Sequence, residues 1–140
     1  RTRLLAADAL ALPLAVGHAD LNGLNTRWVA TQVETWTPIV HDWDSIAGLP
    51  AALLAGGLAM DYLADGGGGI ASVEQGERVL TAFAAGLGRP WSSTELEVAW
   101  AAGTWVACYN AAFEYLHGGP GAVCVQLEHG GHDRLRRAGA

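Results

Sequence analysis

Residues 92–116, SSTELEVAWAAGTWVACYNAAFEYL, are the longest helix that the sequence predicts. Ser92 followed by Glu95 has the form of a capping box, in which each side chain bonds the backbone amide of the other residue. Residues 98–113 carry no charge, but a membrane span needs about 20 apolar residues. We therefore expect a long helix of a globular domain, whose apolar positions include Leu96, Trp100, Val106, Phe113 and Leu116.

Three further helices are predicted on either side of this segment. Residues 51–64 are rich in alanine and leucine, and Pro50 suits a first helical position. A second capping box, Ser72 with Gln75, opens a helix that ends near residues 86–90, where glycines and a proline gather. A last helix is expected from about residue 121 towards Arg137. One face of the second of these helices carries Val73, Val79, Leu80, Phe83 and Leu87.

The first 45 residues differ from the rest of the chain in their pattern of residue types, which favours strands over helices. Residues 14–17, 27–33 and 38–41 are short runs with strand character, separated by turn-forming residues, and residues 2–11 are compatible with the end of a helix. The fold class predicted is α+β and mainly helical, with a small β-hairpin element followed by about four helices. The 140 residues are expected to form a single domain.

Composition limits the partners. Hydrophobic residues make up 51% of the chain and charged residues 16%, which excludes a disordered chain. The formal net charge is −6, so nucleic acid is not expected as a partner, and neither is a membrane. Cys108 and Cys124 are interpreted as free, buried thiols in a reducing, cytoplasmic compartment, with a bridge between helices as the alternative. Homo-oligomerisation is left open.

Polar residues follow the predicted strands. His18, Asp20 and Asn25 come after the first strand, and Asp42 follows the third. Charges at the ends of short strands often converge at one edge of a sheet, so Asp20, Asn25 and Asp42 are expected to share a site. Their oxygens are hard ligands, which favours Mg²⁺ over zinc. A carboxylate without a metal could accept a proton from a hydroxyl.

These residues also carry a resemblance. The stretch HADLNGLN, residues 18–25, followed after one hairpin by VHDWD, residues 40–44, resembles the catalytic core of the aminoglycoside phosphotransferase and choline kinase family. That family has a protein-kinase-like fold, with the pattern H-x-D-x-x-x-x-N and then an Asp that holds Mg²⁺. Two departures, Ala19 for the usual Gly and His41 before the Asp, remove no chemical group. The helical remainder also resembles the carboxy-terminal lobe of the family.

The resemblance implies a role for each matched residue. Asp20 would orient the substrate hydroxyl and accept its proton, and His18 would hold the loop through ring hydrogen bonds to the backbone. Asn25 and Asp42 would bind Mg²⁺ on the phosphates of ATP or GTP. Asp44 receives no chemical step; bonding the loop backbone and facing the substrate are its two alternative roles. The implied activity is transfer of a γ-phosphoryl group to a hydroxyl of a small molecule, with a cationic acceptor as one alternative.

The resemblance divides the chain into residues 1–45, with the catalytic loop and metal-binding hairpin, and residues 46–140, a helical substrate subdomain. It also implies that the nucleotide-binding amino-terminal lobe is missing, because that lobe carries a lysine and this chain contains none. The 140 residues are therefore expected to be inactive alone. A non-catalytic kinase-like binding module, or an inactive fragment, is the alternative function.

Other interpretations remain beside these. Asp20, Asn22 and Asn25 could simply build turns, and the same carboxylates could serve a metal-dependent hydrolase. Trp100 and Trp105 are predicted in the core or in a cleft wall. Five acidic residues are interpreted mostly as solvated helix faces, some of which could line the pocket of a cationic substrate: Asp61, Asp65, Glu95, Glu97 and Glu114.

Overall fold

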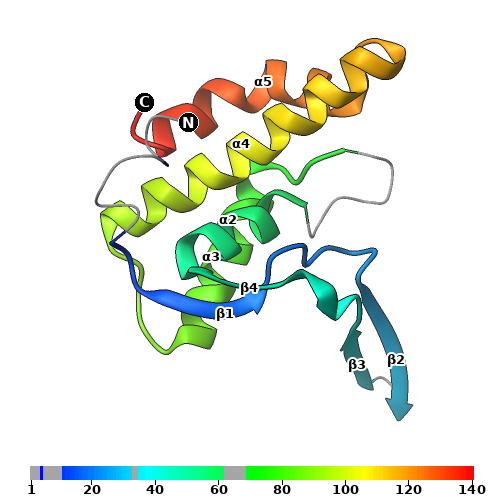
Figure 1. The fold of residues 1–140 in the computed structure, drawn as a ribbon, viewed down its shortest axis with the longest axis vertical. Coiled ribbons are helices and arrows are strands. Elements are labelled where there is room, and N and C mark those ends of the chain that lie inside the picture. Colours follow the sequence, from blue (N-terminus) through cyan, green and yellow to red (C-terminus); the bar gives the residue numbers. More distant parts are fainter. Residues whose placement is uncertain (1–3, 5–10, 33–34, 62–68) are drawn as a thin grey trace.

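The computed structural model describes residue 4 and residues 11–32, 35–61 and 69–140. Within these residues the chain is α+β and mainly helical, as predicted, with four α-helices and two pairs of strands (Figure 1). The predictions for residues 2–10 apart from Leu4, for residues 62–64 at the end of the first helix and for Asp65 lie outside the described residues.

The helices follow the sequence signals closely. α2 spans Ala51–Asp61, α3 spans Val73–Leu87, α4 spans Ser93–Gly118 and α5 spans Ala122–Arg137. Both predicted capping boxes are present: Ser72 pairs with Gln75 at the start of α3, and Ser92 with Glu95 at the start of α4. Helix starts were predictable because a capping box is a local interaction within four residues.

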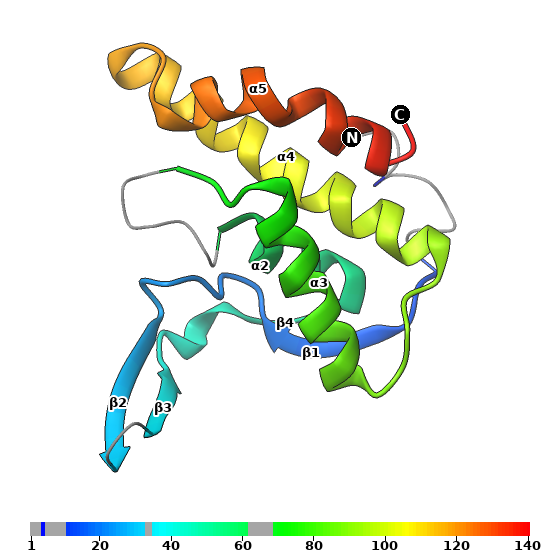
Figure 2. The ribbon, with the colours of Figure 1, turned by 180° about the vertical axis from the view of Figure 1, so that it is seen from behind.

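The strands form two separate antiparallel pairs. β1 (Leu14–His18) pairs with β4 (Ile46–Pro50), with Leu14 opposite Pro50 and His18 opposite Ile46. β2 (Thr26–Gln32) pairs with β3 (Thr35–Val40) in a hairpin that projects from the helical body (Figure 2). The sequence predicted three strands and missed β4, which lies at the start of the segment interpreted as helical. Only the long-range pairing with β1 makes that stretch a strand.

The core lies where α4 crosses α2. The buried residues of this core include Ala55, Ala59, Val98, Ala99 and Trp100, and Leu80 of α3 joins them. Gly56 of α2 has no room for a side chain, because a Cβ there would lie 2.1 Å from the backbone oxygen of Ala99. Small residues therefore bring the two helix backbones into close contact.

Glu95 does not lie on a solvated helix face, so that interpretation was wrong. Its side chain is buried and accepts hydrogen bonds from both terminal nitrogens of Arg89, at 3.0 and 2.6 Å, and from Ser92. The hydrogen bonds from Arg89, reinforced by those from Ser92, outweigh the effect of burial and lower the pKa of Glu95 from 4.5 to about 2. The carboxylate therefore ties the loop before α4 to the first turn of that helix.

Glu95→Gln is expected to lower the free energy of unfolding at pH 7. The pKa shift corresponds to roughly 3 kcal/mol before screening, and we expect about 2 kcal/mol because the Arg89 side chain is 40% exposed. The pKa is lowered in the folded state, so this contribution is complete above pH 4.5 and is lost as the pH falls towards 2. Urea unfolding at pH 7 and pH 2.5 measures both effects.

Glu128→Gln is the matched control, since Glu128 is an exposed glutamate on α5. The urea midpoint of this variant should equal that of the wild-type chain within experimental error. An equal loss of stability in both variants, or a loss for Glu95→Gln that persists unchanged at pH 2.5, would contradict the assigned ion pair.

Glu114 also has a structural role that the sequence did not predict. It is half-buried on α4, and its carboxylate accepts hydrogen bonds from the backbone amides of Val123 and Cys124, at 3.1 and 3.2 Å. The N-cap residue of α5, Gly121, has no side chain with which to cap the helix. Glu114 therefore satisfies the free amides and the positive end of the α5 dipole from the neighbouring helix.

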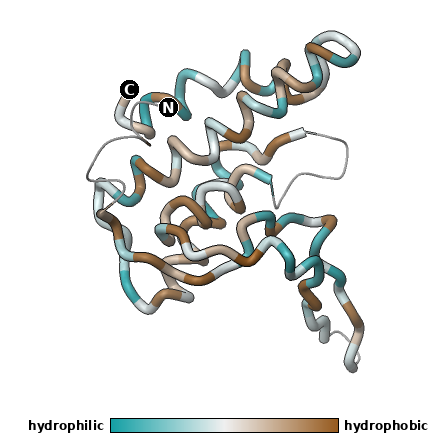
Figure 3. Tube along the Cα trace, in the orientation of Figure 1, coloured by the Kyte–Doolittle hydropathy of each residue, from teal (hydrophilic) through white to brown (hydrophobic). Residues whose placement is uncertain are grey.

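Several large apolar side chains of α4 are exposed. Trp100 is buried as predicted, but Trp105, Phe113 and Leu116 lie at the surface in the second half of α4. Both cysteines are free thiols, as predicted. Cys124 is half-buried, but Cys108 is exposed, so the prediction that Cys108 is buried was wrong. Hydrophobic residues also occur on the projecting β2–β3 hairpin (Figure 3). Among the described residues, no helix has the length and apolarity needed to cross a membrane.

Candidate functional site

The loop after β1 brings Asp20 and Asn25 into contact. The amide nitrogen of Asn25 donates hydrogen bonds to the backbone oxygen of Asp20 at 2.8 Å and to its carboxylate Oδ2 at 3.0 Å. The other carboxylate oxygen, Oδ1, accepts a hydrogen bond from the side-chain amide of Asn22 at 3.2 Å. The Asp20 carboxylate is thus held in one orientation by two amides, and each of its oxygens retains a lone pair for a further donor.

Asn22 shapes this loop. Its side-chain oxygen accepts hydrogen bonds from the backbone amides of Leu24 and Asn25, at 2.9 and 3.1 Å, which is an Asx-type turn. Its backbone oxygen accepts a hydrogen bond from the hydroxyl of Thr26 at 3.0 Å. The turn-building interpretation therefore describes Asn22 well, while Asp20 and Asn25 share a direct side-chain contact in addition.

His18 links the two loops of the site. Its Nε2 lies 3.0 Å from the backbone oxygen of His41, and its Nδ1 accepts a hydrogen bond from the backbone amide of Asp20 at 3.3 Å. A carbonyl oxygen can only accept, so these two contacts together define the tautomer with hydrogen on Nε2. Trp43 packs against the ring edge-on, with centroids 5.8 Å apart. His18 thus has the ring hydrogen bonds to the backbone that the resemblance implies.

Asp42 follows β3 and precedes a short 3₁₀ helix, Trp43–Ser45. Its backbone is left-handed, with φ 65° and ψ 48°, and among the described residues no other non-glycine residue has a positive φ. The neighbouring His41 amide donates to the backbone oxygen of Asn25 at 3.1 Å, and the Trp43 indole donates to Val40 O at 2.9 Å. These contacts hold the chain on either side of a conformation that few L residues adopt.

The two loops meet because of the way the strands pair. His18 ends β1 and Ile46 begins β4, and the hydrogen bond from the Ala19 amide to Ser45 O, at 2.9 Å, extends that pairing into the loops. The sequence placed the site at one edge of a single sheet. The structure places it instead at the junction between two two-stranded sheets.

Asp61 is a residue near the site that the sequence interpreted as solvated. It is the last residue of α2 and is half-buried. Burial raises the pKa of its carboxyl group, and the nearby charge of Asp20 raises it further, while a hydrogen bond with Asn22 opposes both. No local pattern predicts this placement, because it depends on how the end of α2 packs against the loop.

Asn25 and Asp42 carry the types of oxygen donor that a magnesium ion prefers. Asn25 uses its amide nitrogen on Asp20, and no hydrogen bond among the described residues occupies its side-chain oxygen or the carboxylate oxygens of Asp42. An amide oxygen and a carboxylate suit Mg²⁺, which usually takes one or two protein carboxylates and completes its shell with phosphate oxygens and water. The Asp20 carboxylate already accepts hydrogen bonds from Asn22 and Asn25, so it is a poorer metal ligand than Asp42. Asp20 is therefore the candidate general base.

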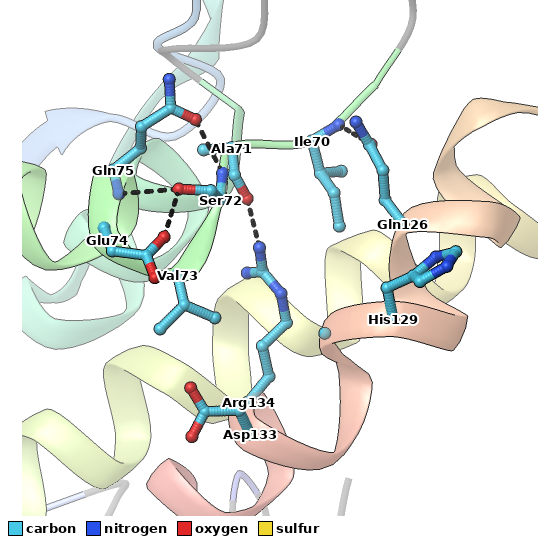
Figure 4. A pocket seen from close by; sticks show the side chains of 11 residues that line it. Ile70, Ala71, Ser72, Val73, Glu74, Gln75, Gln126, His129, Asp133 and Arg134 are labelled. Atoms are coloured by element: carbon cyan, nitrogen blue, oxygen red, sulfur yellow. Dashed lines mark hydrogen bonds between the residues drawn. The ribbon is translucent and has the colours of Figure 1, made fainter.

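Two cavities differ in their position relative to this site. One, of about 310 Å³, is mostly apolar and lies between the β2–β3 hairpin and α3, where Leu21, Thr26, Val40 and Phe83 contribute to its wall. A second, of about 540 Å³, lies between the start of α3 and α5 and contains none of the predicted site residues. In that second cavity Arg134 is buried and donates to the backbone oxygen of Ala71 (Figure 4). The first cavity therefore borders the candidate site, and the second is separate.

The fold and the site together define a small, mainly helical α+β chain that presents a hydrogen-bonded His–Asp–Asn loop beside a strained Asp. Compared with known proteins, the chain matches no family model, no curated protein and no solved structure.

Proposed function

We propose that the chain is the catalytic lobe of a phosphotransferase that moves the γ-phosphoryl group of ATP or GTP to a hydroxyl of a small molecule. The observation that carries this proposal is the contact between Asn25 and Asp20 within a loop that His18 bonds to the residue before Asp42. Phosphoryl transfer depends on positioning and on charge neutralisation, so it needs few groups held in fixed orientations.

Each residue has a defined task in this proposal. The Asp20 carboxylate, held by Asn22 and Asn25, receives the hydroxyl of the acceptor and takes its proton. Asn25 and Asp42 hold Mg²⁺, which when bound neutralises charge on the phosphate oxygens of the nucleotide. His18 is a positioning residue, because its ring hydrogen bonds among the described residues go to backbone groups and its ring packs against Trp43.

The acceptor is proposed to be cationic. Asp61 adds a second carboxylate close to Asp20; burial first, and repulsion by Asp20 in addition, raise the pKa of Asp61, and a bound positive charge would offset that repulsion. A neutral acceptor would leave this repulsion in place. The proposal therefore favours amino-bearing alcohols over neutral sugars.

The absence of lysine in the 140 residues bears on how the nucleotide is held. We propose that a β-rich, lysine-containing nucleotide-binding lobe acts together with this chain. Activity is therefore expected when such a lobe is present, and not from the 140 residues alone. Mg²⁺-dependent release of ADP or GDP in the presence of a panel of hydroxyl compounds, with amino alcohols included, measures it.

Asp42→Asn tests the metal-binding role within that assay. It retains a residue type that tolerates a left-handed backbone but removes the charge, so we expect the Mg²⁺ concentration for half-maximal rate to rise at least about tenfold. Asp44→Asn is the matched control two residues away, and it should behave as wild type. Among the described residues, the Asp44 carboxylate accepts a hydrogen bond from the Ser45 hydroxyl at 3.4 Å and from no other side chain.

The alternative function has a distinct outcome. A binding module would take up Mg·ATP in calorimetry but release no ADP with any hydroxyl compound. Hydrolysis of phosphate esters without any nucleotide would instead indicate a metal-dependent hydrolase. Either result would overturn the proposed transfer reaction.

A further inference from the structure

The second half of α4 presents an exposed apolar stripe. Four large side chains lie on it, and their exposed fractions are 49% for Trp105, 66% for Tyr109, 56% for Phe113 and 78% for Leu116. Ala112, between them, is also exposed. We call these five residues the α4 stripe. Single exposed apolar residues are ordinary, but a contiguous group of this kind marks an interaction surface.

The α4 stripe lies on one side of the helix. At 100° per residue its five members fall within an arc of about 100°. Ala107 and Glu114 lie on the other side; Ala107 is fully buried and Glu114 caps α5. The stripe therefore faces away from α5. Figures 1 and 2 show this end of α4, together with the start of α5, extending beyond the rest of the body.

The charge around the stripe indicates the kind of partner. α4 contains no lysine or arginine, and the chain has a net charge of −6, so an anionic membrane or a nucleic acid does not fit. None of the stripe residues is charged, and Glu114 points to α5. Two copies of this acidic chain can therefore meet at the stripe without placing carboxylates opposite each other.

The area of the stripe suits the core of a dimer. A buried aromatic side chain covers roughly 150–250 Å², so the exposed fractions above amount to about 450 Å² of apolar surface per copy. A standard interface buries about 800 Å² per partner, of which somewhat more than half is non-polar. The stripe supplies about this non-polar share.

We propose that the α4 stripe is a self-association surface through which two copies of this chain form a symmetric dimer. The two α4 helices cross in antiparallel orientation near Ala112, where the small side chain allows close approach between the larger residues on each side. A two-fold axis places the same patch of both copies in contact. This proposal is independent of the proposed phosphotransferase activity and uses none of its residues.

Tyr109→Glu tests the proposal on the 140-residue chain, in reducing buffer so that Cys108 cannot form a disulfide. Sedimentation equilibrium is expected to show a wild-type dimer at micromolar concentrations. The variant introduces two carboxylates into the apolar centre of the interface, so its dissociation constant should rise at least about 100-fold. Circular dichroism checks that the exposed substitution leaves the fold intact.

Tyr115→Glu is the matched control. Tyr115 is on the same helix and is also 66% exposed, but it lies about 120° around the axis from Tyr109. It should leave the dimer unchanged. A monomeric wild type up to about 100 μM would overturn the proposal, since this is far above the expected dissociation constant. A dimer that resists Tyr109→Glu, or one that both variants weaken equally, would overturn it as well.

Discussion

Asp20→Asn is expected to lower kcat of the proposed phosphoryl transfer by roughly 10²–10⁴-fold, the range that a positioned general base contributes. The substitution removes the acceptor for the hydroxyl proton but keeps the backbone oxygen that binds the Asn25 amide. KM for the nucleotide should change little, because Asp20 is not one of its proposed ligands. Both constants are measured from the steady-state release of ADP, with the nucleotide-binding lobe present and with an acceptor identified in the panel of hydroxyl compounds.

Asp44→Asn again serves as the control, because it changes an exposed carboxylate of the adjacent loop without touching Asn22, Asn25 or His18. Thermal unfolding of both variants shows that the loop substitutions leave the fold intact. If Asp20→Asn turns over at the wild-type rate, Asp20 is not the base and the assignment of the loop as catalytic fails.

Gly56→Ala is expected to destabilise the chain by about 3 kcal/mol, at the upper end of the range for overpacked cores. A Cβ at this position would lie 2.1 Å from the Ala99 oxygen and 3.0 Å from the Ala102 Cβ, and both belong to the facing helix α4. The clash is with backbone, so no side-chain rotation relieves it and the helices must separate. The urea midpoint of unfolding, followed by circular dichroism, measures the loss.

Gly57→Ala is the matched control, because it is the next residue of α2 and no atom beyond its chain neighbours and its own helix backbone lies within 4 Å of the added Cβ. Alanine favours helix over glycine by about 1 kcal/mol, so this variant should be more stable than wild type. The two neighbouring substitutions are thus predicted to have opposite signs. Equal effects would show that helix propensity, and not the crossing of α2 and α4, governs this position.

Local signals were sufficient for much of the fold. The capping boxes at Ser72 and Ser92 marked the starts of α3 and α4, and glycine and proline marked the end of α3, because these interactions lie within a few residues of each other. The same holds for the site loop. The five-residue spacing from Asp20 to Asn25 is closed by a turn built on Asn22, which a local pattern can specify.

Other parts of the site needed the folded chain. β4 is a strand only because it pairs with β1, and that pairing brings the loop around Asp42 to the loop around Asp20. Asp61 approaches Asp20 because α2 packs against the same region. Each of these depends on contacts between residues far apart in sequence, which composition and periodicity do not encode.

By itself, then, the sequence determined a mainly helical α+β chain, its helix starts, the acidic charge and a loop with His18, Asp20 and Asn25 in one turn. The tertiary structure decided which apolar and charged residues are buried. Glu95 is buried because Arg89 and Ser92 satisfy its carboxylate, and Phe113 and Leu116 are exposed because their half of α4 extends past the core. Gly103 illustrates the same division. From the sequence alone, a glycine inside a helix only weakens that helix. In the structure, a Cβ at Gly103 would lie 2.7 Å from the backbone oxygen of Gly56, so the close contact between the two helices requires glycine there. Helix propensity is a property of one residue and its neighbours in sequence, whereas burial is a property of what the rest of the chain places beside it.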